Sequence, residues 1–225
     1  MTNNYPLHRH QLDPNLKVYG GREYNGMPIV WQQGPFIYNY LQRIDQAIQA
    51  ALQDHSSLMA IRVDLRLPTQ FYETNPLLKR SVFSKFIDSL RAKIKNRCTE
   101  TERGGIRFHR TKVHYVWTRE FGQNGNPHYH CALFFNKQTF LGLGEFNPHS
   151  QSLYGMISSA WASALGMEGY LTDGLVSIPK NAVYKVRRDE RYDDLFYRVS
   201  YFAKLATKQF GLASHNFGTS RAPHS

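Results

Sequence analysis

Two short segments with alternating apolar residues, joined by a run rich in glycine and asparagine, constrain the fold of this chain most. The first segment is TKVHYVWTRE, residues 111–120, and the second is PHYHCALFFN, residues 127–136. The six residues between them, FGQNGN, include two glycines and two asparagines, which favour tight turns between strands. The sequence therefore predicts an antiparallel β-hairpin in the middle of the chain.

Further strands and helices follow from the spacing of apolar residues. Residues 57–68, SLMAIRVDLRLP, alternate between apolar and other side chains and predict a strand that Pro68 ends. A fourth, short strand is expected at GLVSIPKN, residues 174–181. Apolar residues spaced three or four apart predict helices over residues 35–56, 81–97, 152–166 and 193–211.

Helices and strands are mixed along the chain without strict alternation, which favours an α+β fold. We expect a central antiparallel sheet flanked by helices, in the simplest arrangement on one face of the sheet. Residues 1–34 contain several prolines and glycines and show no sustained period, so we interpret them as an irregular N-terminal leader. Residues 35–221 would form the folded domain.

The chain carries a large positive charge. Its 225 residues include 28 Lys and Arg against 17 Asp and Glu, which gives a formal net charge of +11. This surplus favours a polyanionic partner, most often nucleic acid, although solvated basic surfaces are common in other proteins too. Because the basic residues are spread along the chain, they fit a surface of the folded body better than a disordered arm.

Cysteine usage and hydropathy indicate the compartment. Only two cysteines occur, Cys98 and Cys131, which is too few for a disulfide framework, so a reducing cytoplasm is the expected location. The sequence shows neither an apolar run of membrane-spanning length nor a signal-peptide pattern at its start. We therefore expect a soluble cytoplasmic protein with no membrane partner.

Two histidines stand one residue apart at the start of the second hairpin strand. Residues two apart in a strand point to the same face, so His128 and His130 lie together, opposite the face of Cys131. The hairpin would bring the carboxylate of Glu120 near them. Two imidazoles and one carboxylate with open positions suit Mg²⁺ or Mn²⁺ at a phosphate substrate, and could also hold Zn²⁺. The alternative is that these are surface histidines that bind no metal.

The last predicted helix carries two tyrosines and two lysines in register. Tyr197, Tyr201, Lys204 and Lys208 repeat at helical spacing, on the side opposite the apolar stripe. A tyrosine hydroxyl can attack a phosphodiester when a nearby lysine and a divalent cation offset the charge. Alternatively, the tyrosines cover the edge of the core while the lysines face water.

These stretches, in this order, resemble the HUH endonucleases, which include rolling-circle replication initiators, relaxases and related transposases. EFGQNGNPHYH is similar to the carboxylate-turn-PHxH element of viral and plasmid initiators, and YRVSYFAK resembles the paired-tyrosine YxxxYxxK element of microvirus-type initiators. A closer resemblance, to inovirus-type replication proteins and prophage relatives with the YagK/YfjJ C-terminal domain, spans about residues 35 to 221. The family fold, a central antiparallel sheet of ferredoxin-like type flanked by helices, agrees with the pattern described above.

The resemblance also implies roles for individual residues. The two histidines of the PHxH element and Glu120 would hold the metal. Tyr201 with Lys204 matches the YxxK nucleophile position, and Tyr197 matches the second tyrosine.

Together these features predict a DNA strand nickase for rolling-circle replication of a phage or prophage. Tyr201 would attack a single-stranded or melted DNA origin and stay linked to the 5′ phosphate, leaving a 3′ hydroxyl for a host polymerase. Tyr197 would carry out a second transfer that rejoins the displaced strand. Because the sequence has no Walker-type phosphate loop, unwinding would need a host helicase.

Two other interpretations remain open at this point. A non-catalytic single-stranded nucleic-acid-binding protein would use Tyr115, Trp117 and Tyr129 as stacking platforms and its lysines along the phosphates. This interpretation gives no reason for the histidine, glutamate, tyrosine and lysine constellation. A degenerate prophage copy would keep the fold and lose the activity.

Overall fold

A six-stranded antiparallel sheet forms the centre of the molecule. The computed structural model describes residues 5–68, 82–122, 127–167, 173–208, 210 and 215–220. The strand order is β10-β6-β8-β7-β11, and β9 also pairs with β6. The strands are β6 (Ser57–Arg66), β7 (His114–Phe121), β8 (Pro127–Asn136), β9 (Val176–Ser177), β10 (Val183–Arg187) and β11 (Phe217–Thr219).

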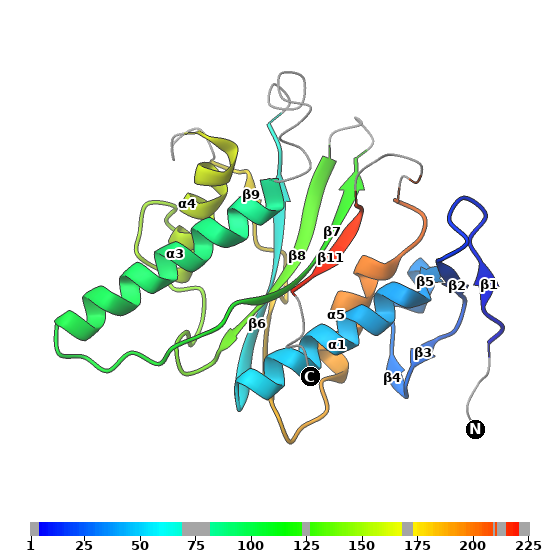
Figure 1. The fold of residues 1–225 in the computed structure, drawn as a ribbon, viewed down its shortest axis with the longest axis horizontal. Helices are drawn as coiled ribbons and strands as arrows, with labels where there is room; N and C mark the ends of the chain where they lie inside the picture. Colours follow the sequence, from blue (N-terminus) through cyan, green and yellow to red (C-terminus); the bar gives the residue numbers. More distant parts are fainter. Residues whose placement is uncertain are drawn as a thin grey trace.

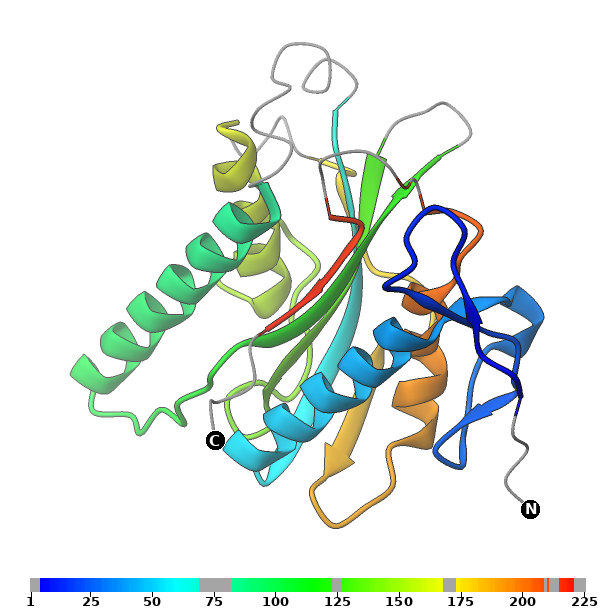
Figure 2. The same cartoon turned by 45° about the vertical axis from the view of Figure 1, so that its right-hand side comes forward.

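Helices cover both faces of this sheet, as Figures 1 and 2 show. The helices α3 (Val82–Arg103) and α4 (Leu153–Leu165) pack on one face, and α1 (Tyr38–Asp54) and α5 (Asp193–Ser200) pack on the other. The α+β prediction is therefore confirmed, whereas the expectation of helices on a single face is wrong. The reason lies in β8, where apolar residues run on consecutively from Cys131 to Phe135, all buried, as in strands enclosed on both sides.

The helices follow the apolar periodicity closely. In α1 the residues Leu41, Ile44 and Ile48 are fully buried, as the spacing predicts. The helix α4 begins after Ser152, whose side chain accepts a hydrogen bond from the Gly155 amide, and ends at Gly166 in the left-handed conformation. No helix within the described residues is long and apolar enough to span a membrane.

The described part of residues 1–34 is more regular than the sequence indicated. It contains β1 (His8–Arg9), β2 (Lys17–Tyr19), β3 (Glu23–Tyr24) and β4 (Met27–Pro28). With β5 (Phe36–Ile37), the strands β1 and β2 make a three-stranded sheet, and β3 pairs with β4. Tyr24 and Ile29 are buried in the same core as α1 and α5, which explains how strands this short are held in place.

The last helix is shorter than predicted. The helix α5 stops at Ser200, a 3-10 turn covers Tyr201–Ala203, and Lys204 is extended at ψ 133°. Lys204 makes an isolated β-bridge with Phe36, and the Leu205 amide donates to the Pro35 carbonyl. The chain leaves the helix because backbone pairing with the segment before α1 replaces the next helical turn.

Some predicted features lie outside the described residues. These are residues 123–126 of the hairpin turn, the start of the second predicted helix at Ser81, the predicted helix end at Gly211, and the end of the predicted domain at residue 221.

Candidate metal centre and tyrosine site

Three predicted metal ligands meet at one end of the central strands. In the register of the hairpin, Glu120 of β7 lies directly opposite His128 of β8, and His130 follows two residues later on the same face. The Nε2 atoms of the two histidines are 3.1 Å apart, and Nε2 of His130 is 3.5 Å from Oε2 of Glu120. One ligand atom from each residue falls within 4.8 Å of the other two.

A second carboxylate holds one of these imidazoles. Asp64 lies opposite His130 in the pairing of β6 with β8, and its Oδ1 is 2.6 Å from Nδ1 of His130. This contact occupies one ring nitrogen and leaves Nε2 for the side of Glu120, an arrangement common for metal-bound histidines. Arg62 sits beside both groups, with Nε 3.4 Å from Oδ1 of Asp64.

Glu120 is buried, and a lysine holds the carboxylate oxygen that does not face His130. Its exposed fraction is 3%, and its Oε1 accepts a hydrogen bond of 3.0 Å from Nζ of Lys208. Burial raises the pKa of the Glu120 carboxyl, but the hydrogen bond with His130 and the charge of Lys208 outweigh burial and hold the pKa well below its usual value. The carboxylate is therefore ionised, and Oε2 remains on the side of the histidines.

The pKa values of the neighbouring groups are shifted as well. Burial lowers the pKa of His130, but the hydrogen bonds with Asp64 and Glu120 outweigh it and the pKa is raised. For Asp64, burial raises the pKa, whereas the hydrogen bond with His130 brings it below its usual value. The two carboxylates thus flank His130 on either side, and Arg62, Lys204 and Lys208 lie against them.

Tyr201 lies next to the three ligands. Its ring is 5.8 Å from the ring of His130, edge to face, and its hydroxyl accepts a hydrogen bond of 2.7 Å from Nζ of Lys204. The guanidinium carbon of Arg62 is 5.2 Å from the centre of the Tyr201 ring. The same Lys204 ammonium is 4.0 Å from Oε2 of Glu120, so one lysine touches both the phenol and the carboxylate.

The four residues expected on one helix face are divided in the structure. Tyr201 and Lys204 lie beyond the end of α5, and Lys208 is buried against Glu120 rather than facing a substrate. Tyr197 is on α5 with an exposed fraction of 39%. Among the described interactions, none joins the Tyr197 side chain to the three ligands, whereas Tyr201 lies beside them.

The donor set fits a divalent cation. Two imidazole nitrogens and one carboxylate oxygen from adjacent strands leave coordination positions for water or a phosphate oxygen, and Mg²⁺, Mn²⁺ and Zn²⁺ accept such ligands. The ionised Glu120, held by Lys208, supplies a fixed negative charge. The side chains of Tyr201 and Lys204 stand at the edge of this set.

The comparisons with known proteins cover most of the described fold, from β3 to β11. Residues 21–220 match the YagK/YfjJ C-terminal domain. The chain belongs to this family. The uncharacterized protein YfjJ of Escherichia coli (strain K12) is 34% identical over 202 residues, which cover 84% of this chain and 96% of YfjJ. The uncharacterized protein YagK of the same organism is 32% identical over 198 residues, 84% of this chain and 95% of YagK.

No solved structure shows a significant match to the chain. The family match begins at residue 21 and therefore takes in β3 and β4, which lie in the segment that the sequence pattern predicts to be an irregular leader. It ends at residue 220 and includes every residue of the candidate site. The family membership thus agrees with a core that extends into the N-terminal segment.

Three residues of the site were missed or misplaced by sequence reasoning. Asp64 and Arg62 alternate on one face of the predicted strand, so the pattern could have placed them on a common surface. It could not show that this strand lies beside the histidine strand. Lys208 was expected on a helix, and its contact with Glu120 depends on the chain leaving that helix.

The aromatic residues proposed as stacking platforms are mostly turned inward. Tyr129 is 2% exposed and packs against Phe83 and Trp117. Tyr115 and Trp117 are partly buried against the same core. Tyr129 therefore cannot stack on a base, which weakens the interpretation as a simple binding module.

Proposed function

We propose that this protein is a metal-dependent DNA strand nickase of the HUH type that initiates rolling-circle replication of a phage or prophage. The observation that carries the proposal is the position of the Tyr201 phenol, hydrogen-bonded to Lys204 and adjacent to the Glu120 and histidine cluster. The formal net charge of +11 supports a nucleic-acid substrate. Family membership does not bear on the activity, because both relatives are uncharacterized.

In this proposal Tyr201 is the nucleophile. Its hydroxyl oxygen forms a bond to the scissile phosphorus as the bond between phosphorus and the 3′ oxygen breaks. The 3′ oxygen takes up a proton from solvent and becomes a free hydroxyl, while the 5′ phosphate stays on the tyrosine. The phenol proton passes to water, and the Lys204 ammonium offsets the negative charge that develops on the phenol oxygen.

Glu120, His128 and His130 would hold the divalent ion. When bound, the ion polarises the scissile phosphate and offsets the charge that develops on its oxygens. Asp64 keeps the His130 ring oriented, and Arg62 lies between this carboxylate and the Tyr201 ring. A second transfer by Tyr197 would rejoin the displaced strand, after a new phosphate approaches this exposed side chain.

The partners follow from the same chemistry. The substrate is single-stranded or locally melted DNA, a host helicase unwinds the duplex, and a host polymerase extends the 3′ hydroxyl. Basic side chains on the surface would hold the strand by its phosphates, so affinity should fall with increasing salt.

The proposal is tested by incubating the protein with a pool of labelled single-stranded oligonucleotides, with Mn²⁺ or with EDTA, and separating the products on a denaturing gel. We expect a covalent protein–DNA band with Mn²⁺ that is absent with EDTA. Replacing both His128 and His130 by Ala should abolish the band while weakening DNA binding much less. A protein that binds the strands equally with Mn²⁺ and EDTA, and never forms the band, would be a non-catalytic binder.

A further inference from the structure

Arg62 extends from the middle of β6 on the face of the sheet that carries the candidate metal centre. It precedes Asp64 by two residues along the strand, so the two side chains point to the same face. In the strand pairing it lies opposite Ala132 of β8. The Arg62 side chain is only 12% exposed. A charge with so little access to water needs partners within the protein, and those of Arg62 come from two different parts of the site.

The first part is the pair of groups beside the metal ligands. Nε of Arg62 is 3.4 Å from Oδ1 of Asp64, and Nη2 of Arg62 is 3.3 Å from Nδ1 of His130. The same Oδ1 atom is 2.6 Å from Nδ1 of His130. Arg62 and His130 therefore compete for one carboxylate oxygen, the one that orients the imidazole.

The second part is the segment that carries the proposed nucleophile. The guanidinium carbon of Arg62 is 5.2 Å from the centre of the Tyr201 ring and 5.7 Å from the centre of the Phe202 ring. Guanidinium groups are attracted to aromatic faces at such distances. Lys204 contacts the same phenol, with Nζ 4.2 Å from the ring centre and 2.7 Å from the hydroxyl. Two cations from different segments thus contact the Tyr201 side chain.

These contacts matter because of where Tyr201 stands. It lies in the 3-10 turn that follows α5, and the backbone hydrogen bonds of such turns are weaker than those of an α-helix. Side-chain contacts therefore contribute more to the direction of its ring. Arg62 connects this ring to β6, the strand that also orients His130 through Asp64. One residue thus joins a metal ligand to the proposed nucleophile.

Arg62 also affects the metal centre through its charge. The guanidinium carries a fixed positive charge and contacts His130, one of the three candidate ligands. A cation bound to the same imidazole would be repelled by this charge, since like charges at short range are only partly screened inside a protein. Arg62 therefore opposes binding of the ion while it supports the tyrosine. A general contribution to folding would not give effects of opposite sign.

We propose that Arg62 is a positioning residue with two opposite effects. It orients the Tyr201 ring for the transfer reaction, and it weakens the binding of a divalent ion at Glu120, His128 and His130. The inference rests on the proposed function for the reaction of the tyrosine and on the three ligands for the ion. Arg62 thus makes the metal centre bind its ion less tightly than its ligands alone would.

Calorimetric titration of the full chain with Mn²⁺ tests the effect on the ion. Arg62→Gln should bind Mn²⁺ about 3- to 30-fold more tightly than the wild type, because a repelling charge is removed and the Asp64 oxygen is left to the imidazole. Arg62→Lys keeps the charge and should stay within about 3-fold of the wild type. An Arg62→Gln protein that binds Mn²⁺ as weakly as the wild type, or more weakly, overturns the inference.

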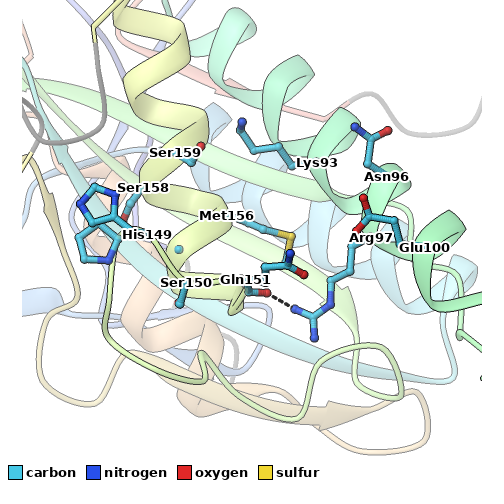
Figure 3. A pocket seen from close by; sticks show the side chains of 12 residues that line it. Lys93, Asn96, Arg97, Glu100, His149, Ser150, Gln151, Met156, Ser158 and Ser159 are labelled. Carbon is cyan, nitrogen blue, oxygen red and sulfur yellow. Dashed lines mark hydrogen bonds between the residues drawn. The ribbon is translucent and has the colours of Figure 1, made fainter. Parts of the chain in front are cut away.

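Arg97→Gln is the matched control. Arg97 lies on the other face of the sheet, at the wall of a pocket between α3 and α4, where its guanidinium donates to the Gln151 carbonyl (Figure 3). This change removes the same charge from another hydrogen-bonded arginine, and the Mn²⁺ affinity should equal that of the wild type. An increase as large as that of Arg62→Gln would mean that net charge alone sets the affinity, and the inference would fail.

Nuclear magnetic resonance of the tyrosine rings tests the effect on Tyr201 without any cleavage. The Tyr201 signal is identified by its absence in Tyr201→Phe. It should shift in Arg62→Gln and in Arg62→Lys, because neither side chain replaces the planar guanidinium beside the ring. Arg97→Gln should leave it unchanged. A Tyr201 signal at the wild-type position in both Arg62 variants would show that the arginine does not orient this ring.

The covalent DNA band connects the two effects. At saturating Mn²⁺, Arg62→Gln should form the band on the order of 10- to 100-fold more slowly than the wild type, because the nucleophile is misplaced, although it binds the ion more tightly. If the wild type forms the band and Arg62→Gln forms it equally fast, the inference fails and the proposed function stands. If the wild type forms no band, the proposed function fails, and the Mn²⁺ titration and the Tyr201 signal still decide the two effects of Arg62.

Discussion

The carboxylate of Asp64 lies 2.6 Å from Nδ1 of His130, so the ring is fixed from β6 while its Nε2 faces Glu120. We predict that Asp64→Ala lowers the affinity for Mn²⁺ by about 10- to 100-fold, because the imidazole loses the partner that orients it. Asp64→Asn, which keeps an oxygen acceptor, should retain part of this affinity. Calorimetric titration with Mn²⁺ measures both changes.

The matched control for this prediction is Asp88→Ala. Asp88 is exposed on α3 and should leave the Mn²⁺ affinity unchanged. Equal affinities in the wild type and in Asp64→Ala would show that the contact with His130 does not position a metal ligand.

Lys208 and Glu120 form a buried ion pair. Replacing Lys208 tests both what this pair contributes to stability and whether a cation binds beside Glu120. Lys208→Met leaves the Glu120 carboxylate without its closest cation, which should cost about 3 kcal/mol of the free energy of unfolding. Because a bound cation would replace the missing ammonium charge, Mn²⁺ should raise the melting temperature of this variant more than that of the wild type. Thermal unfolding with and without Mn²⁺ measures both effects.

The control for Lys208→Met is Lys185→Met on the exposed edge of β10, which should melt as the wild type does. A Lys208→Met protein whose melting temperature does not respond to Mn²⁺ would argue against a cation beside Glu120.

His114 gives a prediction for the pH dependence of stability. Its Nε2 is 2.6 Å from Oδ2 of Asp54; burial lowers the pKa of His114 by more than the Asp54 contact raises it, so the net shift is downward. Below pH 6.5, the ordinary value, the unfolded chain therefore binds a proton that the folded chain does not. Stability should fall as the pH drops below this value, with a slope of at most about 1.4 kcal/mol per pH unit.

Asp54, the partner of His114, affects stability at lower pH. Burial raises the pKa of Asp54, but its hydrogen bonds with Lys112 and His114 outweigh burial and lower it. The stabilisation from this carboxylate is therefore present above pH 3.8, its ordinary value, and is lost as the pH falls further.

The His114 prediction is tested by urea unfolding between pH 7 and 5. The free energy of unfolding of His114→Gln should fall less over this range than that of the wild type. The control His8→Gln, at an exposed position, should match the wild type. If the free energy of unfolding depended on pH equally in all three proteins, His114 would not be the group that causes the loss of stability.

The sequence pattern predicts the hairpin and the residues that it brings together. Alternation in the two hairpin segments places the histidines on one face, and the short turn places Glu120 opposite His128, as the register shows. Helix spacing likewise predicted α1 and α4. These features depend on contacts between residues near each other in the chain, which local patterns record.

Local sequence patterns do not predict features that depend on contacts between residues far apart in the chain. The pattern after Ser200 remains compatible with a helix, and the helix ends because Lys204 pairs with Phe36, far away in the sequence. The contact of Asp64 with His130 depends on which strand lies beside β8. One local signal was overlooked: Asn25 and Gly26 both have positive φ, as in the two-residue turns that join hairpins.

The measurement that tests the central claim most directly is peptide mapping of the covalent protein–DNA complex by mass spectrometry, after reaction with single-stranded DNA and Mn²⁺. We predict a nucleotide-linked phosphate on Tyr201 in the first-cleavage product. The adduct should be lost in Tyr201→Phe and kept in Tyr197→Phe. An adduct on Tyr197 alone, or an adduct that Tyr201→Phe forms at the wild-type rate, would contradict the assignment of Tyr201 as the nucleophile beside the metal centre.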